Sequence, residues 1–263
     1  MAESKSVSTT PERSFRVLGV RVDAVQIDDV VRRMQTWIQN QESGHYISVT
    51  GMHGVTEALH DQEFTKVLNT SSLVVPDGMP LVWIGRRRGF PLARRVYGPE
   101  LMETFCAQTA SEGCRHFLYG GAPYIAERLA DQLTARFPEL QIAGTFCPPF
   151  RALTQDEDTK IVDLIRRSHA DVVWVGLSTP KQERWMFEHK DKLGVPVLIG
   201  VGAAFDFHAG RMKQAPAWMR ENGLEWLFRL AQEPRRLWRR YILNGSEFVF
   251  NLALQELGLR RFD

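Results

Sequence analysis

Ser72-Leu73-Val74-Val75-Pro76-Asp77-Gly78 is the stretch that indicates the fold, because it leads from a short apolar run straight into a turn. Leu73 to Val75 are typical of a buried strand, and the proline and glycine after them force the chain to turn. Residues 79–88 then have a helical pattern. A strand followed directly by a helix is the repeating unit of a parallel sheet, so the sequence predicts Asp77 at the carboxyl end of a strand.

Asp77 is the acidic residue of that turn. In open α/β sheets, ligands bind in the crevice beyond the carboxyl ends of the strands, and a carboxylate there is well placed for catalysis. The alternative is an ordinary turn aspartate whose side chain hydrogen-bonds the nearby backbone. This stretch alone leaves both interpretations open.

The same alternation of strand and helix extends in both directions. Residues 15–25 predict a strand or small hairpin with Gly19 at its turn. Further strands are expected at 46–50, 116–119, 140–145, 171–177 and 195–201, and helices at 27–41, 55–68, 99–112, 123–136, 154–168 and 180–192. This pattern predicts an α/β, Rossmann-like fold with a mainly parallel sheet and helices on both faces.

Three regions of the chain differ in composition. Residues 1–12 are polar and rich in Ser and Thr, which predicts a disordered N-terminus. Residues 13–209 carry the alternating strands and helices and form the expected α/β core. After about residue 210 the strand patterns stop, and Trp, Arg and Leu dominate several predicted helices. We therefore expect a helical C-terminal segment over residues 210–263, called the appendage below.

The overall composition excludes several classes of protein. With 263 residues, 44% of them hydrophobic, the chain can bury a substantial core, and a net charge of +2 implies no nucleic-acid partner. The three cysteines lack any C-x-x-C spacing, so neither a disulfide framework nor a zinc site is expected. No run reaches the ~20 apolar residues that span a bilayer, and the N-terminus lacks a signal-peptide pattern, so we expect a cytoplasmic protein.

A second strand end, at residues 176–183, is typical of an anion or nucleotide site. Gly176 allows a close backbone approach, Ser178 or Thr179 can cap the next helix, and Pro180 suits its first position. The free N–H groups and dipole of that helix would then favour a phosphate. An ordinary capped helix start explains the same residues. Gly120 and Gly121 follow another apolar strand and form a weaker candidate of the same kind.

Other binding motifs are missing or have a simpler explanation. The sequence has no phosphate-binding P-loop and no G-x-S-x-G elbow, and residues 200–205 lack the third glycine of a dinucleotide fingerprint. Asp156-Glu157-Asp158 resembles a metal-binding D-x-D, but it opens a predicted helix, where acidic residues suit the dipole. We therefore expect no metal site and no cofactor. Of the histidines, only His53 lies next to a predicted strand end.

The appendage contains an amphipathic pattern after Pro234. At 100° per residue, Arg235, Arg236, Arg239 and Arg240 fall on one side, and Leu237, Trp238, Tyr241 and Ile242 fall on the other. This pattern is typical of a helix that lies in a membrane interface. The alternative is a solvated basic face above an apolar stripe that packs on the core. Arginine also suits a diphosphate, which it can bind with two parallel hydrogen bonds.

Six segments, taken in order, resemble the WecG/TagA/CpsF family of bacterial glycosyltransferases. They are V-V-P-D-G-M-P (74–80), R-V-Y-G-P-E-L-M (95–102), F-L-Y-G-G (117–121), G-L-S-T-P-K-Q-E (176–183), G-V-G-A-A-F-D-F-x-A-G (200–210) and G-L-E-W-L-F-R-L-A-Q-E-P-R-R-L-W-R-R-Y (223–241). The resemblance covers about residues 14–260. It is strongest to members that build polysaccharide repeat units, including those of xanthan-type exopolysaccharide.

The resemblance implies an inverting, metal-independent transfer from a UDP-sugar to a sugar that is linked through diphosphate to a polyprenyl lipid. It further implies a cytoplasmic enzyme bound peripherally to the inner face of the cell membrane, with homo-oligomers possible. Glucose, N-acetylmannosamine and its uronic acid all remain candidate donor sugars. Two rival functions also remain open: a peripheral protein that binds lipid diphosphates without catalysis, and a nucleotide-sugar hydrolase.

The resemblance also assigns residues to roles. Asp77 matches the proposed general base of the family, and Arg95 and Thr50 match further active-site positions. The expected nucleotide-sugar residues are Gly120, Gly121, Gly176, Ser178, Thr179, Lys181, Gln182 and Glu183. Arg229, Arg236 and Arg239 match basic positions that would bind the diphosphate, whereas Trp238, Tyr241, Arg235 and Arg240 are assigned to the membrane. One departure is Gly51-Met52, because family members commonly have an asparagine directly after the residue that matches Thr50.

Overall fold

The computed structural model describes residues 13–262, so the predicted disorder of residues 1–12 lies outside the described residues. A six-stranded sheet in the order β4-β3-β8-β7-β5-β6 forms its centre, and every neighbouring pair of strands is parallel. The strands are β3 (His45–Thr50), β4 (Leu73–Pro76), β5 (Arg115–Gly120), β6 (Gln141–Phe146), β7 (Val172–Gly176) and β8 (Val197–Gly200). The predicted parallel α/β fold is confirmed.

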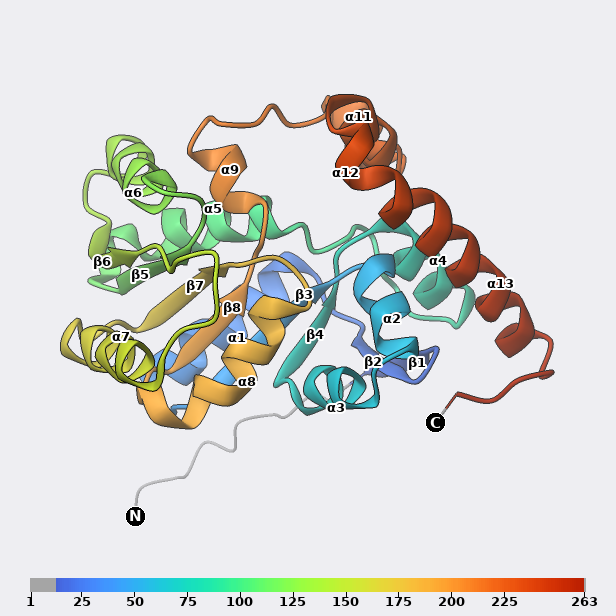
Figure 1. The fold of residues 1–263 in the computed structure, drawn as a ribbon, viewed down its shortest axis with the longest axis horizontal. Helices are drawn as coiled ribbons and strands as arrows, with labels where there is room; N and C mark the ends of the chain where they lie inside the picture. The colour runs from blue at the N-terminus through green and yellow to red at the C-terminus, as the bar shows by residue number, and fades with distance from the viewer. Residues whose placement is uncertain (1–12, 263) are drawn as a thin grey trace, which may run out of the picture.

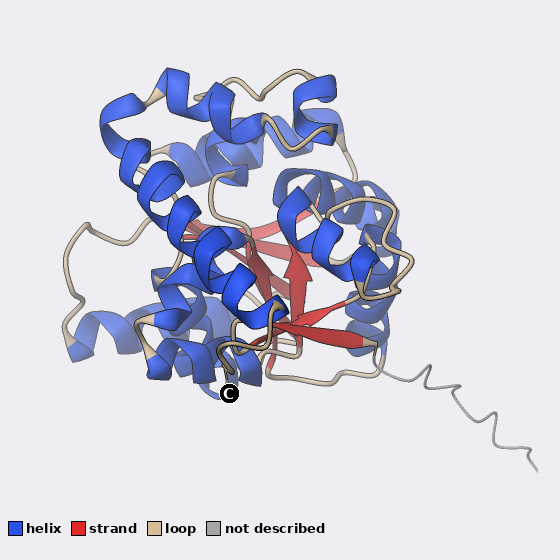
Figure 2. Ribbon diagram, turned by 90° about the vertical axis from the view of Figure 1, so that its right-hand side faces the viewer, coloured by secondary structure: helices blue, strands red, loops and turns tan. Residues whose placement is uncertain are grey.

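Helices cover both faces of this sheet (Figures 1 and 2). One face packs against α1 (Ile27–Gln39), α5 (Gly98–Thr109), α6 (Ile125–Arg136) and α9 (Ala204–His208), and the other against α7 (Gln155–Arg167) and α8 (Lys181–Leu193). Alternation along the strands explains the two layers, because successive side chains point to opposite faces. In β3, Ile47 and Val49 belong to the first cluster and Tyr46 to the second.

A third apolar cluster lies at the β4 edge of the sheet. It joins the hairpin of β1 (Ser14–Val17) and β2 (Val20–Asp23) to α2 (Met52–Leu59), α3 (Gln62–Thr70) and α4 (Met79–Arg87). Leu18 and Gly19 form the predicted turn of the hairpin, both with positive φ. The Asp23 carboxylate accepts a hydrogen bond of 2.7 Å from the Val74 backbone N–H, which ties the hairpin to β4.

The appendage is helical throughout its ordered elements. It contains α10 (Ala217–Glu221), α11 (Glu225–Gln232), α12 (Pro234–Trp238), the π-helical turn η2 (Arg239–Leu243) and α13 (Asn244–Glu256), drawn in orange and red in Figure 1. Helix α13 packs against α2, and its Phe248 is buried in the third cluster. The Gln255 side chain accepts a hydrogen bond of 2.9 Å from the Leu18 N–H. Within residues 13–262, no helix has the length and apolar character to cross a membrane.

The connections create a crevice between β3 and β8. Helices α2 and α3 follow β3, and α3 packs beside α8, whereas α9 follows β8 on the opposite face of the sheet. The chain therefore leaves two neighbouring strands in opposite directions. In open α/β sheets such a switch point, beyond the carboxyl ends of the strands, is where ligands bind.

Candidate active site

A cavity of about 1470 Å³ lies above this switch point. Its floor comes from the carboxyl ends of the strands and its roof from the appendage, which supplies α11, η2 and part of α13. The volume exceeds the ~300–1,000 Å³ of a typical small-molecule site. There is room for two substrates side by side.

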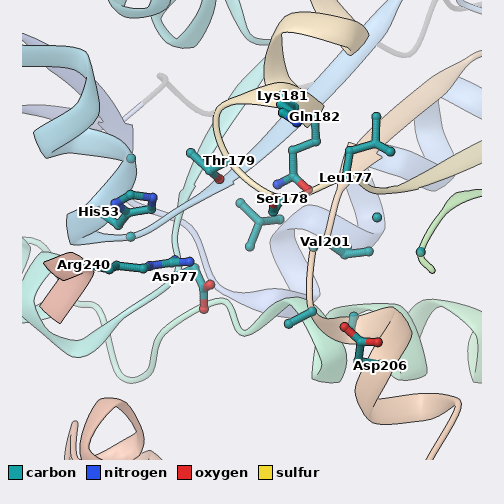
Figure 3. A pocket seen from close by; sticks show the side chains of 18 of the residues that line it. His53, Asp77, Leu177, Ser178, Thr179, Lys181, Gln182, Val201, Asp206 and Arg240 are labelled. Carbon is teal, nitrogen blue, oxygen red and sulfur yellow. The ribbon is translucent and has the colours of Figure 1, made fainter. Parts of the chain in front are cut away.

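Asp77 stands directly after β4 and faces this cavity (Figure 3). Its backbone N–H donates to the Thr50 carbonyl oxygen at 2.8 Å, which fixes the turn against β3. The Asp77 Oδ1 atom is buried and has no hydrogen-bond partner among the described residues. The turn-aspartate alternative is thus not observed for this oxygen, which is free to accept a proton.

The charged groups around Asp77 shift its pKa in opposite directions. Burial raises the pKa of Asp77 to about 6, and the carboxylate of Glu225 raises it as well, while the guanidinium groups of Arg95, Arg229 and Arg240 lower it. Figure 3 shows the Arg240 side chain extended toward Asp77. A carboxylate with a pKa near neutrality is a stronger base than an ordinary exposed aspartate.

The close contact between Gly51 and the Asp77 backbone explains why this position is a glycine. A Cβ atom at Gly51 would lie 2.4 Å from the Asp77 carbonyl oxygen, a distance that real Cβ contacts do not reach. The obstacle is backbone, which cannot rotate away. With the backbone placed as it is here, the departure from the family pattern leaves room for no side chain after Thr50.

Gly51→Ala is therefore expected to destabilise the protein by about 1–3 kcal/mol, the usual cost of an overpacked site. The strands must shift, and kcat should fall with stability because Asp77 moves. Thermal unfolding together with turnover measures both effects. Gly245→Ala is the matched control, since its Cβ would meet the Met52 methyl group at an ordinary 3.5 Å. Equal stability of the two variants would contradict this explanation.

Arg95 lies beside Asp77 on the segment that crosses the end of β4. The N–H of Val96 donates to the Pro76 carbonyl oxygen at 2.8 Å, which holds this segment in place. The Arg95 Cζ atom is 4.1 Å from the centre of the Tyr97 ring, and its guanidinium donates to the Glu225 carboxylate. Arg95 therefore links the core to the appendage.

Two appendage arginines lie elsewhere than their expected roles would place them. Arg240, assigned to the membrane, lines the cavity, whereas Arg239, assigned to the diphosphate, is exposed with its guanidinium 5.4 Å from the Trp238 ring centre. Both residues lie in η2, a π-helical turn that contains more residues per turn than the 3.6 of an α-helix. The assumed 100° per residue fails there.

Two cavity arginines carry unpaired groups. The Nε atoms of Arg229 and Arg240 are buried without a hydrogen-bond partner in residues 13–262. Arg236 also lines the cavity, but its guanidinium is paired with Glu233, with Nε 2.8 Å from Oε1. Buried donors without partners are what an anionic ligand would satisfy.

The start of α8 differs from the prediction. Pro180 is the N-cap residue rather than the first helical residue, and neither Ser178 nor Thr179 caps the helix within the described chain. The Thr179 hydroxyl instead donates to Glu183 Oε1 at 2.8 Å, and the Gln182 amide donates to the same oxygen at 3.0 Å. Burial raises the pKa of Glu183. The Glu183 carboxylate thus orients the side chains of Thr179 and Gln182.

The predicted glycines bring strand ends together. A Cβ at Gly120 would lie 2.7 Å from the Gly176 carbonyl, and one at Gly176 would lie 2.7 Å from the Phe205 ring. The Gly121 N–H donates to the Gly176 oxygen at 2.9 Å. These positions keep β5, β7 and α9 in close contact, and Gly121 and Gly176 also face the cavity.

Most of the predicted site residues gather around one cavity. Its walls include Asp77, Arg95, Gly121, Gly176, Ser178, Thr179, Lys181, Gln182, Arg229, Arg236, Arg240 and Tyr241. Outside its walls lie Thr50, Gly120, Glu183, Arg235, Trp238 and Arg239. Thr50 is buried behind the cavity wall, and its hydroxyl has no hydrogen-bond partner among the described residues.

Sequence reasoning missed several parts of the wall. They include the loop after β8, where Val201 to Ala203 line the cavity, Glu225 in the first turn of α11, and residues 148–155 after β6. A single acidic residue between apolar neighbours in G-L-E-W was the available signal for Glu225. In the sequence, Gly200 and Gly202 indicated only an incomplete dinucleotide fingerprint.

Residues 156–158 open α7, as predicted. Thr154 and Glu157 form a capping box there, with the Thr154 N–H 2.9 Å from the Glu157 carboxylate. Within residues 13–262, no three His, Cys, Asp or Glu side chains are grouped to hold a metal ion. His53 lies beside the cavity, and burial together with Arg240 lowers its pKa to about 3, so its ring is neutral.

Comparison with known proteins places this geometry in a family. The model of the Glycosyl transferase WecG/TagA/CpsF family matches residues 15–262. Among curated proteins, the N-acetylglucosaminyldiphosphoundecaprenol N-acetyl-beta-D-mannosaminyltransferase of Bacillus subtilis (strain 168) is 29% identical over 223 residues, 85% of this chain and 84% of the relative. The protein of the same name in Staphylococcus aureus (strain MW2) is 28% identical over 236 residues, 88% of this chain and 91% of the relative. The chain therefore belongs to the WecG/TagA/CpsF family of glycosyltransferases.

Proposed function

We propose that this glycosyltransferase moves a hexosyl or N-acetylhexosaminyl group from a UDP-sugar to a sugar that is linked through diphosphate to a polyprenyl lipid. The transfer inverts the anomeric carbon, and Asp77 is the general base. The observation that carries this proposal is the buried, unpaired Oδ1 of Asp77 in a cavity with space for two substrates. The relatives support the substrate classes through the reaction that their name describes.

Asp77 acts on the acceptor. A sugar hydroxyl must lose its proton as it attacks the anomeric carbon, and a base within reach can accept that proton. Oδ1 has no competing donor among the described residues, so it is available for this hydroxyl. Burial raises the pKa of this carboxylate to about 6, which favours proton transfer near neutral pH.

The arginines act on the leaving group. Negative charge grows on UDP as the bond to the sugar breaks, and preorganised cationic donors stabilise that charge most where water is excluded. Arg229 and Arg240 present unpaired Nε donors, and Arg236 stands at the same wall. We propose that these three bind diphosphate groups. The transfer is proposed to need no metal ion.

The decisive experiment measures UDP release from a panel of UDP-sugars. Each is incubated with a lipid-linked N-acetylglucosaminyl diphosphate, with and without a strong chelator. UDP-glucose, UDP-N-acetylmannosamine and its uronic acid form are the donors to compare. Release only with acceptor supports transfer, release without acceptor indicates a hydrolase, and no release with intact lipid binding indicates a non-catalytic binding protein.

The pH profile tests the environment of Asp77. Below a pH of about 6 the carboxylate becomes protonated and cannot accept a proton, so kcat/KM should fall about tenfold for each further pH unit. Above that pH it should level off. A kcat/KM profile between pH 4 and 8 checks this. An acidic limb near 4, where ordinary aspartates titrate, would contradict the proposed environment.

We also propose that residues 210–263 form a unit that seats the enzyme on the membrane surface. The appendage exposes large apolar side chains that a lipid interface would cover: Trp218, Trp226, Leu227, Trp238, Ile242, Leu243, Val249 and Phe250. Arg235 and Arg239 lie exposed among them and suit anionic headgroups. The same appendage lines the cavity, so a lipid-linked acceptor held at the membrane would lie close to it.

Trp238→Ala is expected to weaken binding to anionic liposomes roughly tenfold, because an interfacial aromatic loses a large part of its buried area. Sedimentation with liposomes measures this, and raising the salt concentration should weaken binding further, since basic contacts are screened. Tyr124→Ala is the control: Tyr124 is 82% exposed but lies on the core. An equal loss of liposome binding in the two variants would contradict a membrane-binding surface on the appendage.

A further inference from the structure

Glu225 is a buried acidic residue with no role in the reaction proposed above. It lies in the first turn of α11, is 7% exposed, and belongs to the appendage, yet its carboxylate reaches two core residues. Oε1 accepts a hydrogen bond of 3.1 Å from the Tyr97 hydroxyl, and Oε2 accepts one from the Arg95 guanidinium. Both carboxylate oxygens therefore hold the segment beside Asp77.

Arg95 is fixed from two sides by this arrangement. The Tyr97 ring lies beneath its guanidinium, with 4.1 Å between Cζ and the ring centre, and Glu225 binds its NH2 group. The Arg95 and Glu225 side chains are 14% and 9% exposed. A buried ion pair requires good geometry from both partners, and removal of one leaves an uncompensated charge.

The turn at Gly223, directly before α11, packs tightly on α4. Gly223 has a φ of +74°, and a Cβ there would lie 3.1 Å from Met79 and 3.2 Å from Trp83. Helix α4 begins directly after the Asp77-Gly78 turn. The packing of this turn on α4 therefore also places Glu225 beside Arg95.

We propose that Glu225 is a positioning residue for the reaction: it binds Arg95 so that this arginine stands next to Asp77 without pairing with Oδ1. The catalytic site is then complete only when the appendage is docked. The inference rests on the proposed function in one respect, the role of Asp77 as base. Without Glu225, the Arg95 guanidinium would turn to Asp77, a carboxylate that also attracts it, and the base would be blocked.

The charged groups around Asp77 give this inference a signature that a merely structural contact lacks. Facing the Asp77 carboxylate are Arg95 from the segment after α4, Glu225 and Arg229 from α11, and Arg240 from η2, with His53 of α2 beside Arg240. Glu225 is the member of this set that raises the pKa of Asp77. Loss of its charge should therefore shift the acidic limb of kcat/KM to lower pH.

Two substitutions separate charge from reach. Glu225→Gln keeps the length but removes the charge, so kcat should fall roughly 10- to 100-fold and the acidic limb should move down by ~0.5–1 pH unit. Glu225→Asp keeps the charge but shortens the reach to Arg95, so kcat should fall while the limb stays near its original pH. Glu221→Gln, an exposed acid on α10, is the control and should change neither.

Thermal unfolding verifies that each variant is folded, and KM for the donor should change little. Wild-type kcat in Glu225→Asp, or a lowered kcat in Glu225→Gln with an unmoved acidic limb, would overturn the proposal. If the Gln variant does not fold, the Asp variant alone decides. Asp77→Asn in the same assay keeps the two ideas apart: full activity there refutes the base, whereas an inactive Asp77→Asn with unaffected Glu225 variants refutes only the positioning role.

Discussion

Asp77→Asn is expected to lower kcat about 10²- to 10⁴-fold, because asparagine preserves the shape of the side chain but cannot accept the acceptor proton. Donor binding should change little, since the variant removes an interaction that matters only as the hydroxyl attacks. Burial raises the pKa of Asp77, so the fold disfavours the charged side chain and the neutral variant should remain folded.

Single-turnover measurements with saturating donor and a soluble acceptor analogue give this rate without product release. The remaining activity should also lose the acidic limb near pH 6, because the titrating group is gone. Turnover within about tenfold of the wild type would be too small a loss for a general base. In that case the base would have to be sought elsewhere in the cavity.

Arg240→Ala is expected to lower kcat about 10²- to 10³-fold, as does removal of a preorganised donor to a developing negative charge in other enzymes. Arg240 is half-buried in the cavity wall with its Nε atom fully covered, and desolvation lowers the pKa of its guanidinium, so it is a poorly solvated cation that an anion would stabilise. Arg229→Ala should have a similar effect for the same reason.

Arg239→Ala is the matched control for this prediction. It removes an identical side chain one residue away, but Arg239 is exposed and lies against Trp238 outside the cavity. On a soluble acceptor its turnover should equal that of the wild type, and only liposome binding should weaken. The opposite ranking of Arg239 and Arg240 would contradict the proposed role of Arg240 and favour the diphosphate role that the family resemblance implies for Arg239.

The sheet was predictable because its signals are local. Most of the strands are short apolar runs followed by Gly or Pro, and a helix comes soon after several of them, so Asp77 could be placed at a strand end from its neighbours alone. Binding at that end is a general property of parallel sheets. The convergence of Asp77, Gly176 and Gln182 on one cavity follows from the same rule.

The details of the appendage were not predictable by the same means. The helical wheel places Arg239 and Arg240 on the same side and so cannot tell which of them lines the cavity, and the π-helical turn that contains both has no sequence signature in this chain. The role of Glu225 depends on Arg95 and Tyr97, which are 130 and 128 residues away in sequence. The same applies to Thr179, whose hydroxyl binds Glu183 rather than the helix end.

The contact between the hairpin and α13 has a consequence for how the protein is made. Phe15 and Phe248 belong to one buried cluster, and Leu18 is hydrogen-bonded to Gln255, 237 residues later. A ribosome adds roughly 5–20 residues each second, so the first strands wait for many seconds before their last partner emerges. The nascent chain therefore keeps part of its apolar surface uncovered until synthesis passes residue 255, and the roof of the cavity arrives last.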